Sequence, residues 1–283
     1  MGRSGMPCHR GSAVSAGVRT ASGFDGLARH YDLLMGFVNY DRWETTCSVL
    51  SELLTRDFQH VDFACGTGVL VERFRKRGWR SQGLDLSRLM LASGLKDRGK
   101  LPVACADLRA CPLRESVDLA TCLFDSLNFL LEPEDLAKSF SEMAQALRPG
   151  GLLYVDVVTE RMILDHFVGP EWTEQNGRVS LRWKTRYNRQ AKLAETTVRI
   201  NTGAPNVFRE RVYPMDFLLD CIAKAGLMLL GAYDAHGWKA PSASSVRLDF
   251  VAVKPPHQIP STRYAALELD IQSLVRGMPD TND

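Results

Sequence analysis

From residue 61 to residue 158 the chain alternates short apolar runs with stretches in which apolar residues recur every third or fourth position. The short runs predict buried strands, and the stretches between them predict amphipathic helices. The predicted strands are 61–64, 80–84, 101–105, 117–123 and 152–158, and the predicted helices are 69–77, 87–96 and 134–147. Strict alternation of this kind indicates an α/β fold with a parallel, doubly wound sheet covered on both faces.

The pattern differs on both sides of this core. Helical periodicity begins at Phe24 and returns between Trp43 and Leu54, which predicts helices before the first strand. After residue 158, apolar and basic residues alternate over 181–187, which predicts a half-exposed strand. Further predicted elements are a turn at 188–190, strands at 194–200 and 207–212, a helix at 215–225, and a closing strand pair at 228–233 and 246–253.

These elements predict one main domain over 24–254. An antiparallel β insertion at about 159–213 is expected to form a lid on the substrate side. Residues 1–23 are rich in Arg and Ser and contain no acid, which is typical of transit peptides, but their apolar residues are too few for an amphipathic helix, so we expect a disordered extension. The tail 255–283 contains one possible helix with Tyr264, Leu267, Ile271 and Leu274 on one face.

Composition excludes several classes of protein. The chain has 283 residues, 45% of them hydrophobic and 24% charged, which excludes a mainly disordered or fibrous protein. Its formal charge of +2 provides no global field to attract nucleic acid or anionic lipid. No apolar run approaches the roughly 20 residues that a spanning helix requires, so we expect no membrane partner.

The seven cysteines contain no CxxC pair and have no His at zinc spacing, and no acid cluster suggests Mg²⁺, so no metal is expected. An odd cysteine number without a secretory signal predicts reduced thiols and a cytoplasmic location.

The segment from Asp62 to Gly68 carries the strongest chemical signal. Gly66 and Gly68 stand between a predicted strand and a predicted helix, where the backbone can turn tightly and approach a ligand. Asp85 follows the second strand, at a position suited to binding a ribose diol. Asp107 follows the third strand and could accept from an adenine amino group. Together they predict an adenosine-containing ligand at the carboxyl ends of the strands, although the third glycine of a dinucleotide fingerprint is absent.

Four motifs in order resemble those of class I S-adenosylmethionine-dependent methyltransferases: DFACGTG at 62–68, GLDLSRLML at 83–91, ADL at 106–108 and LRPGG at 147–151. The resemblance covers about 24–254 and implies S-adenosylmethionine as cofactor. It also implies a Rossmann-like, seven-stranded sheet whose last strand is antiparallel. Ala64 departs from the glycine that most members carry. The implied cofactor-binding residues are Tyr31, Trp43, Asp62, Ala64, Cys65, Gly66, Gly68, Asp85, Leu86, Met90, Asp107, Leu108 and Phe124.

A finer resemblance rests on YDLLM at 31–35, Tyr40 with Trp43, and DSLN at 125–128. It is to a bacterial group of small methyltransferases similar to glycine, sarcosine and aminosugar N-methyltransferases. It implies that the N-terminal helices close over the cofactor and that the loop after the fourth strand lies near the transferred methyl group. Asp125 and Asn128 are therefore the candidate catalytic residues, with His236 and Trp238 as weaker ones.

Each of these residues also has a structural interpretation. Asp125 could be a helix N-cap, Tyr31 and Trp43 could belong to the core, Asp62 could support the loop by binding its amides, and Cys65 could be a small packing residue.

We expect an enzyme that methylates N or O of a small molecule. Eight basic residues against two acids over 181–211 give some support for an acidic acceptor, although the alternation is also typical of a solvated sheet face. Nucleic-acid methylation is an alternative, but DSLN stands where DNA amino-methyltransferases carry Asn/Asp-Pro-Pro-aromatic. A non-catalytic S-adenosylmethionine-binding protein is the other alternative. The oligomeric state stays open between monomer and homodimer.

Overall fold

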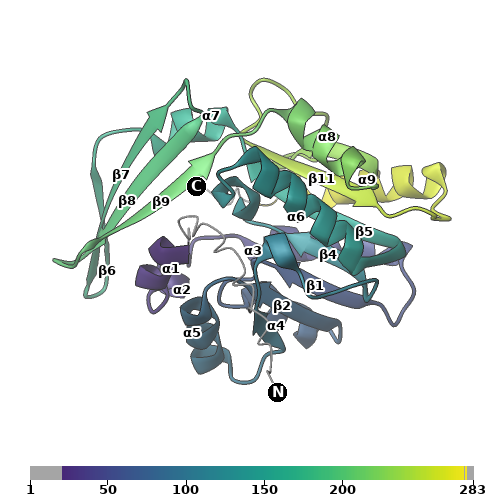
Figure 1. The fold of residues 1–283 in the computed structure, drawn as a ribbon, viewed down its shortest axis with the longest axis horizontal. Helices are drawn as coiled ribbons and strands as arrows, with labels where there is room; N and C mark the ends of the chain where they lie inside the picture. Colours follow the sequence, from purple (N-terminus) through teal and green to yellow (C-terminus); the bar gives the residue numbers. More distant parts are fainter. Residues whose placement is uncertain (1–20, 277, 279–283) are drawn as a thin grey trace, which may run out of the picture.

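A computed structural model describes residues 21–276 and residue 278. Within this part of the chain a seven-stranded sheet has the strand order β10-β11-β5-β4-β1-β2-β3 (Figure 1). Its strands are β1 (Gln59–Phe63), β2 (Arg80–Asp85), β3 (Val103–Cys105), β4 (Val117–Cys122), β5 (Leu147–Val158), β10 (Met228–Asp234) and β11 (Arg247–Val253). β1 to β5 pair in parallel, whereas β11 runs antiparallel to both of its neighbours. The expected Rossmann-like architecture with an antiparallel last strand is thereby confirmed.

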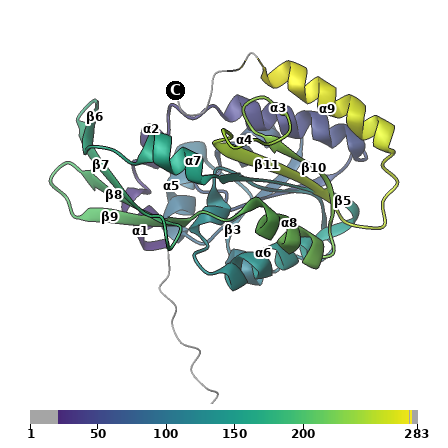
Figure 2. The same ribbon diagram turned by 90° about the horizontal axis from the view of Figure 1, so that it is seen from above.

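Helices cover both faces of the sheet (Figure 2). On one face, α6 (Pro133–Ala146) and α8 (Met215–Lys224) bury Phe140 and Leu218 in one core cluster. On the other, α3 (Tyr40–Leu50), α4 (Val69–Lys76) and α9 (Ser261–Val275) bury residues such as Leu50, Phe74 and Ile271 in a second cluster. Burial of both faces explains why the parallel strands are continuous apolar runs.

The helix α5 (Arg88–Arg98) lies directly on the loop that follows β1. Ser87 is its N-cap, as predicted, and the Ser87 side chain accepts a hydrogen bond from the Met90 amide at 3.1 Å. A Cβ at Gly94 would lie 1.8 Å from the carbonyl oxygen of Thr67. Only a glycine at this position lets the helix backbone approach the loop so closely.

Residues 160–211 form the insertion expected after β5. It contains α7 (Glu160–Met162), a π-helical turn at Ile163–Phe167, and a four-stranded antiparallel sheet that extends away from the main sheet (Figure 1). The strands are β6 (Trp172–Asn176), β7 (Val179–Asn188), β8 (Leu193–Ile200) and β9 (Pro205–Arg211). β6 was not predicted, because most of its residues are polar and show no alternation. We call β6 to β9 the lid sheet.

The lid sheet has an apolar inner face and a basic outer face. Leu181, Val198 and Phe208 are buried against the N-terminal helices. Arg182, Lys184 and Arg186 alternate with the inward residues and therefore lie on the outer face. The basic residues of this segment thus lie largely on the solvated outer face, as the alternative interpretation held, and give no support for an acidic acceptor.

The N-terminal part forms two short helices, α1 (Ala21–Leu27) and α2 (Tyr31–Leu34), where periodicity suggested a helix from Phe24 onward. The expected disordered extension at 1–23 lies outside the described residues except for its last three. These three residues belong to α1. Gly23 lets this helix lie close to β9, since a Cβ there would lie 2.6 Å from the carbonyl oxygen of Val207.

The C-terminal tail packs against the core. Tyr264, Leu267, Ile271 and Val275 of α9 are buried, and the Tyr264 and Tyr233 hydroxyls lie 3.0 Å apart. The predicted face was wrong in one position, because Leu274 is 49% exposed and Val275 takes the buried place.

Substitution of Gly94 by Ala should destabilise the protein even though alanine is the better helix former. Higher helix propensity favours alanine by about 1 kcal/mol, but the new Cβ meets a backbone oxygen that cannot rotate away. Overpacking of this kind costs about 1–3 kcal/mol or more. Urea denaturation should show a net loss of about 2 kcal/mol in the free energy of unfolding. The Gly169→Ala control has open space around its Cβ and should change little; equal stability of both variants would contradict this packing.

Candidate active site

The loop after β1 is held in an unusual backbone conformation at the carboxyl edge of the sheet. Ala64, Gly66 and Gly68 all have positive φ angles, of 54°, 58° and 82°. The Cys65 amide donates to the Leu84 carbonyl at 3.0 Å, and the Gly66 amide donates to Asp85 Oδ2 at 2.8 Å. The loop is therefore pinned to the end of β2, and the non-glycine Ala64 bears strain there.

Asp85 lies where the first two strands end. Its carboxylate accepts hydrogen bonds from the amides of Gly66 and Ser87, the latter at 2.7 Å, and burial raises its pKa. Each carboxylate oxygen retains a second lone pair for a ligand hydroxyl. A Cβ at Gly66 would lie 3.4 Å from Met90 Cε, so glycine leaves space between the loop and that side chain. This arrangement fits the ribose and adenine of S-adenosylmethionine.

Leu86, Asp107 and Leu108 also lie at this edge, but Asp107 is engaged differently from the expectation. It is the N-cap of a short 3-10 helix (Leu108–Ala110), and both of its carboxylate oxygens bind the side chain of Arg109. Arg109 in turn pairs with Asp135 at 2.7 Å and lowers the pKa of Asp107. An adenine amino group would therefore share this carboxylate with Arg109.

Asp62 lies below the glycine loop in a buried hydrogen-bonded chain. Thr121 Oγ1 donates to Asp62 Oδ1 at 2.6 Å and lies 3.0 Å from His60 Nε2, whereas His60 Nδ1 lies 2.8 Å from Ser81 Oγ. When Asp62 is ionised, the Thr121 hydroxyl donates a hydrogen bond to the carboxylate, so His60 Nε2 carries the hydrogen and donates to Thr121 Oγ1. The hydrogen bond that Asp62 accepts thus comes from Thr121 of β4, whereas we had expected the amides of the glycine loop as donors.

Cys65 is a packing residue. Its Sγ would lie 2.6 Å from a Cβ at Gly83, which explains the glycine in β2. Burial raises the pKa of this thiol, so it is a poor nucleophile at neutral pH.

Two carboxylates of the N-terminal helices bind the loops that follow β1 and β2. Asp32 of α2 accepts from Thr67 Oγ1 and from Arg98 Nη2, both at 2.5 Å. Asp25 of α1 accepts from Ser87 Oγ at 2.5 Å. Helices α1 and α2, which we call the cap, are thereby tied to the loops that fit the cofactor.

Tyr31 and Trp43 have different surroundings. Burial raises the pKa of the Tyr31 phenol well above its usual range, and nearby groups that include Asp125 and Asp85 raise it further. Trp43 is almost fully buried, and its Nε1 donates to Asp156 Oδ2 at 3.1 Å. Trp43 therefore has the core-packing role that its structural interpretation allowed, and its contact with the cofactor stays a prediction.

The end of β4 carries a second strained turn. Phe124 and Asp125 have φ angles of 59° and 51°. The Asp125 amide donates to Asp156 Oδ1 at 2.7 Å. Arg247 donates to Asp156 and to Asp125, each at 3.0 Å, and its guanidinium lies over the rings of Trp43 and Phe124. Sequence reasoning missed Arg247, although an arginine opening an apolar strand was a usable signal.

The residues of the DSLN motif divide into two roles. Asp125 is the N-cap residue of the short helix Ser126–Phe129, as its structural interpretation held, but its side chain makes no capping hydrogen bond. The side chain of Asn128 binds two backbone segments. Its Oδ1 accepts a hydrogen bond from the Val158 backbone amide at 3.0 Å, and its Nδ2 donates to the backbone carbonyls of Val158 and Arg211, at 3.2 and 2.9 Å. Asn128 therefore joins β5 to β9, which is a positioning role.

The two weaker candidates lie elsewhere. Trp238 is buried and stacks on Tyr233 at 4.3 Å between ring centroids, and His236 is exposed in the loop between β10 and β11.

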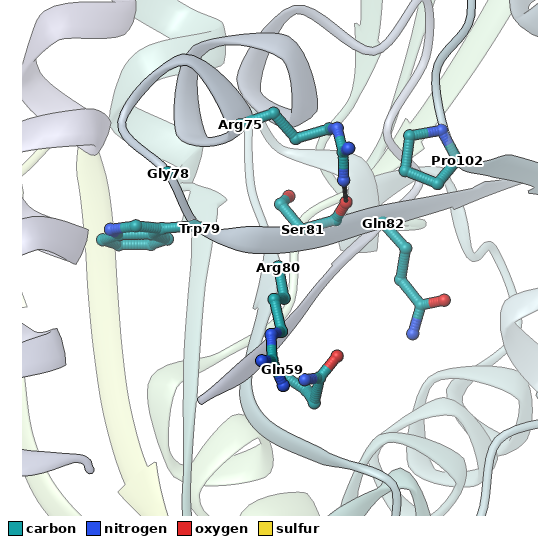
Figure 3. Close-up of a pocket in the computed structure, with 8 residues that line it drawn as sticks. All are labelled: Gln59, Arg75, Gly78, Trp79, Arg80, Ser81, Gln82 and Pro102. Atoms are coloured by element: carbon teal, nitrogen blue, oxygen red, sulfur yellow. Dashed lines mark hydrogen bonds between the residues drawn. The ribbon is translucent and has the colours of Figure 1, made fainter. Parts of the chain in front are cut away.

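A separate hollow of about 490 Å³ lies at the opposite, amino edge of the strands (Figure 3). Arg75, Trp79, Arg80 and Pro102 contribute to its lining, and Arg75 binds the Ser81 carbonyl there. None of the predicted site residues lines it. Among the residues that the structure describes, no group of three or more His, Cys, Asp or Glu could hold a metal ion, and no helix could span a membrane.

Substitution of Asp62 by Asn should flatten the pH dependence of stability. Burial raises the pKa of Asp62 from 3.8 to about 7, so between these values the folded protein binds one more proton than the unfolded chain. The free energy of unfolding therefore falls as pH rises through this window, by up to about 1.4 kcal/mol per unit. Denaturation from pH 4 to 7 should show a shallower slope for Asp62→Asn, which keeps an acceptor for Thr121. An unchanged slope, matching that of the exposed control Asp97→Asn, would contradict the shift.

Comparisons with known proteins agree with this geometry. Residues 61–151 match the model of a methyltransferase domain. A protein of Geobacillus sp. (strain WCH70) whose name proposes methyltransferase activity is 27% identical over 245 residues, covering 82% of this chain and 99% of its own. The dTDP-4-amino-2,3,4,6-tetradeoxy-D-glucose N,N-dimethyltransferase of Saccharopolyspora spinosa is 33% identical over 96 residues, which cover 34% of this chain and 39% of that protein.

The fold has a close counterpart among solved structures. An S-adenosylmethionine-dependent methyltransferase from Clostridium acetobutylicum superposes with a TM-score of 0.70 at 22% identity, covering 82% of this chain and 98% of that one. The chain is therefore an S-adenosylmethionine-dependent methyltransferase built on the class I fold.

Proposed function

We propose that this enzyme methylates a nitrogen or oxygen atom of a compact small molecule held between the cap and the lid sheet. The carrying observation is a cluster of aromatic rings from both covers at the carboxyl edge. Phe24 of α1 lies 4.9 Å from Phe129 and 4.9 Å from Phe208 of β9, and 6.2 Å from Tyr31, between ring centroids. Such a cluster favours a small acceptor with an apolar body.

When bound, the cofactor supplies an electrophilic methyl group, whose carbon–sulfur bonding pair leaves with the neutral thioether, so no acid is required. The chain's own contribution is alignment, which can supply about 7–11 kcal/mol of the barrier, together with removal of a proton from the acceptor. Gly66, Asp85 and Met90 would hold the cofactor, and Tyr31 of the cap would close over it.

Asp125 is our proposed proton acceptor. It lies in the turn at the carboxyl end of β4 and forms a buried ion pair with Arg247 at 3.0 Å. The Asn128 side chain holds the ends of β5 and β9 together by binding the backbone of both Val158 and Arg211. The aminosugar N,N-dimethyltransferase among the relatives supports nitrogen as the acceptor atom.

The geometry gives less support to the alternatives. Nucleic acid would be attracted by the outer face of the lid sheet, but Arg182 and Arg186 point away from the cofactor edge. The other alternative, a non-catalytic protein, would be recognised by binding of S-adenosylmethionine without transfer of a methyl group to any metabolite pool.

Replacement of Asp85 by Ala should abolish binding of S-adenosylmethionine, because the ribose loses its acceptor and the Gly66 amide loses its partner. Calorimetric titration should show saturable binding by the intact protein and none by the variant. The control Asp97→Ala removes an exposed carboxylate nearby and should bind normally. Equal binding by Asp85→Ala, or no binding by the intact protein, would contradict the proposed cofactor site.

Replacement of Asp32 by Asn should weaken binding of S-adenosylhomocysteine by about tenfold, since charge-assisted bonds of the cap to Thr67 and Arg98 are lost. Asp97→Asn, next to Arg98 in sequence but exposed, is the matched control. Calorimetry on both variants tests whether cap closure contributes to cofactor affinity, and unchanged affinity in Asp32→Asn would show that it does not.

A further inference from the structure

Strand β9 of the lid sheet places a buried carboxylic side chain against the candidate proton acceptor. Glu210 is 4% exposed and lies on the inner face, two residues beyond Phe208. Its carboxyl group hydrogen-bonds the carboxyl group of Asp125, which is itself 8% exposed. The two residues are 85 positions apart in sequence and meet because Asn128 ties the turn after β4 to β9.

Two polar atoms beside Asp125 have no hydrogen-bond partner among the described residues. One is Glu210 Oε1, an acceptor, and the other is Arg247 Nε, a donor. The Arg247 side chain is 6% exposed. Buried polar atoms left without partners cost folding free energy, and in native sites they commonly bind a ligand or water. The pair indicates a polar niche next to Asp125.

Two carboxyl groups in hydrogen-bonding contact require a shared proton. Arg247 donates to Asp125 Oδ1 at 3.0 Å, whereas Glu210 has no such ion-pair partner among the described residues. Burial and the neighbouring Asp125 charge raise the pKa of Glu210 well above its usual range. Glu210 is therefore the acid of the pair, and its unpartnered Oε1 is a carbonyl oxygen that can accept a hydrogen bond.

The charge around this niche favours a cation. Asp125 and Asp156 present two carboxyl groups to the single guanidinium of Arg247. The nearby Tyr31 phenol adds no charge at physiological pH, since an ordinary phenol has a pKa of about 10. A ligand that carries a positive charge and donates hydrogen bonds would satisfy both the charge balance and Glu210 Oε1.

We propose that Asp125 and Glu210 form a proton-sharing carboxyl pair that recognises the acceptor as a protonated amine, so that the substrates are cationic amines rather than alcohols or acids. This inference rests on the proposed function. The ammonium group donates to Glu210 Oε1 and to Asp125. One N–H bond then breaks, its electron pair stays on nitrogen as the lone pair needed for attack, and the proton passes to Asp125 and onward to solvent.

The shared proton is tested by infrared spectroscopy of the full-length protein at neutral pH, saturated with S-adenosylhomocysteine. The difference spectrum between wild type and Glu210→Gln should show loss of a protonated carboxylic-acid band. The matched control is Glu195→Gln, the same substitution on the outer face of the lid sheet, where Glu195 pairs with Arg209. That variant should lose only an ionised carboxylate band. A Glu210→Gln spectrum like that of the control would overturn the proposal.

The preference for cations is tested with two probes of equal shape, cyclohexylamine and cyclohexanol. Calorimetry on the wild type with S-adenosylhomocysteine bound should show that the charged amine binds about tenfold more tightly. Glu210→Gln should lose this preference, and Glu195→Gln should retain it. Equal binding of the two probes by the wild type would overturn the proposal even if Glu210→Gln failed to fold. Failure of S-adenosylhomocysteine to bind would instead contradict the proposed function.

Discussion

Asp156 organises the active site from inside the sheet. It is fully buried in β5 and accepts hydrogen bonds from the Asp125 amide, Trp43 Nε1 and Arg247 Nη1. These bonds join β4, α3 and β11 to β5 and hold the strained turn at Phe124 and Asp125. Removing one partner of such a buried ion pair typically costs about 3–5 kcal/mol. The cluster therefore explains how two non-glycine residues persist in the left-handed region at the end of β4.

The edge of the sheet is enclosed by two covers that are built differently. The cap is held by side-chain carboxylates, Asp25 and Asp32, on the loops that fit the cofactor. The lid sheet is held by backbone contacts through Asn128 and by the apolar contact of Phe208 with α1. Because the cap packs on the lid sheet, the same two helices border both the proposed cofactor site and the proposed acceptor site. Methyl transfer in such a space depends on alignment with little water present.

The core of the fold was predictable from sequence, because buried parallel strands and amphipathic helices leave distinct periods. The glycine loop and Asp85 were predictable from local spacing. The contacts of Glu210 and Arg247 with Asp125 were not, since only the packing of β9 on the turn after β4, and the pairing of β11 with β5, creates them; for Arg247 the sequence offered only its place at the start of an apolar strand. The two interpretations of Trp43 could not be separated, because a buried aromatic residue and a cofactor-contacting one have the same helical spacing. The alternation of Arg182, Lys184 and Arg186 with apolar residues did indicate the solvated outer face on which they lie.

The central claim is that cofactor and acceptor meet at the carboxyl edge between cap and lid sheet. A crystal structure of the complex with S-adenosylhomocysteine tests it most directly. The account predicts electron density along the glycine loop, with the ribose at Asp85 and the homocysteine sulfur on the side of Tyr31 and Asp125. Density in the hollow at the amino edge, beside Trp79 and Pro102, or a ligand remote from Asp85, would contradict the account.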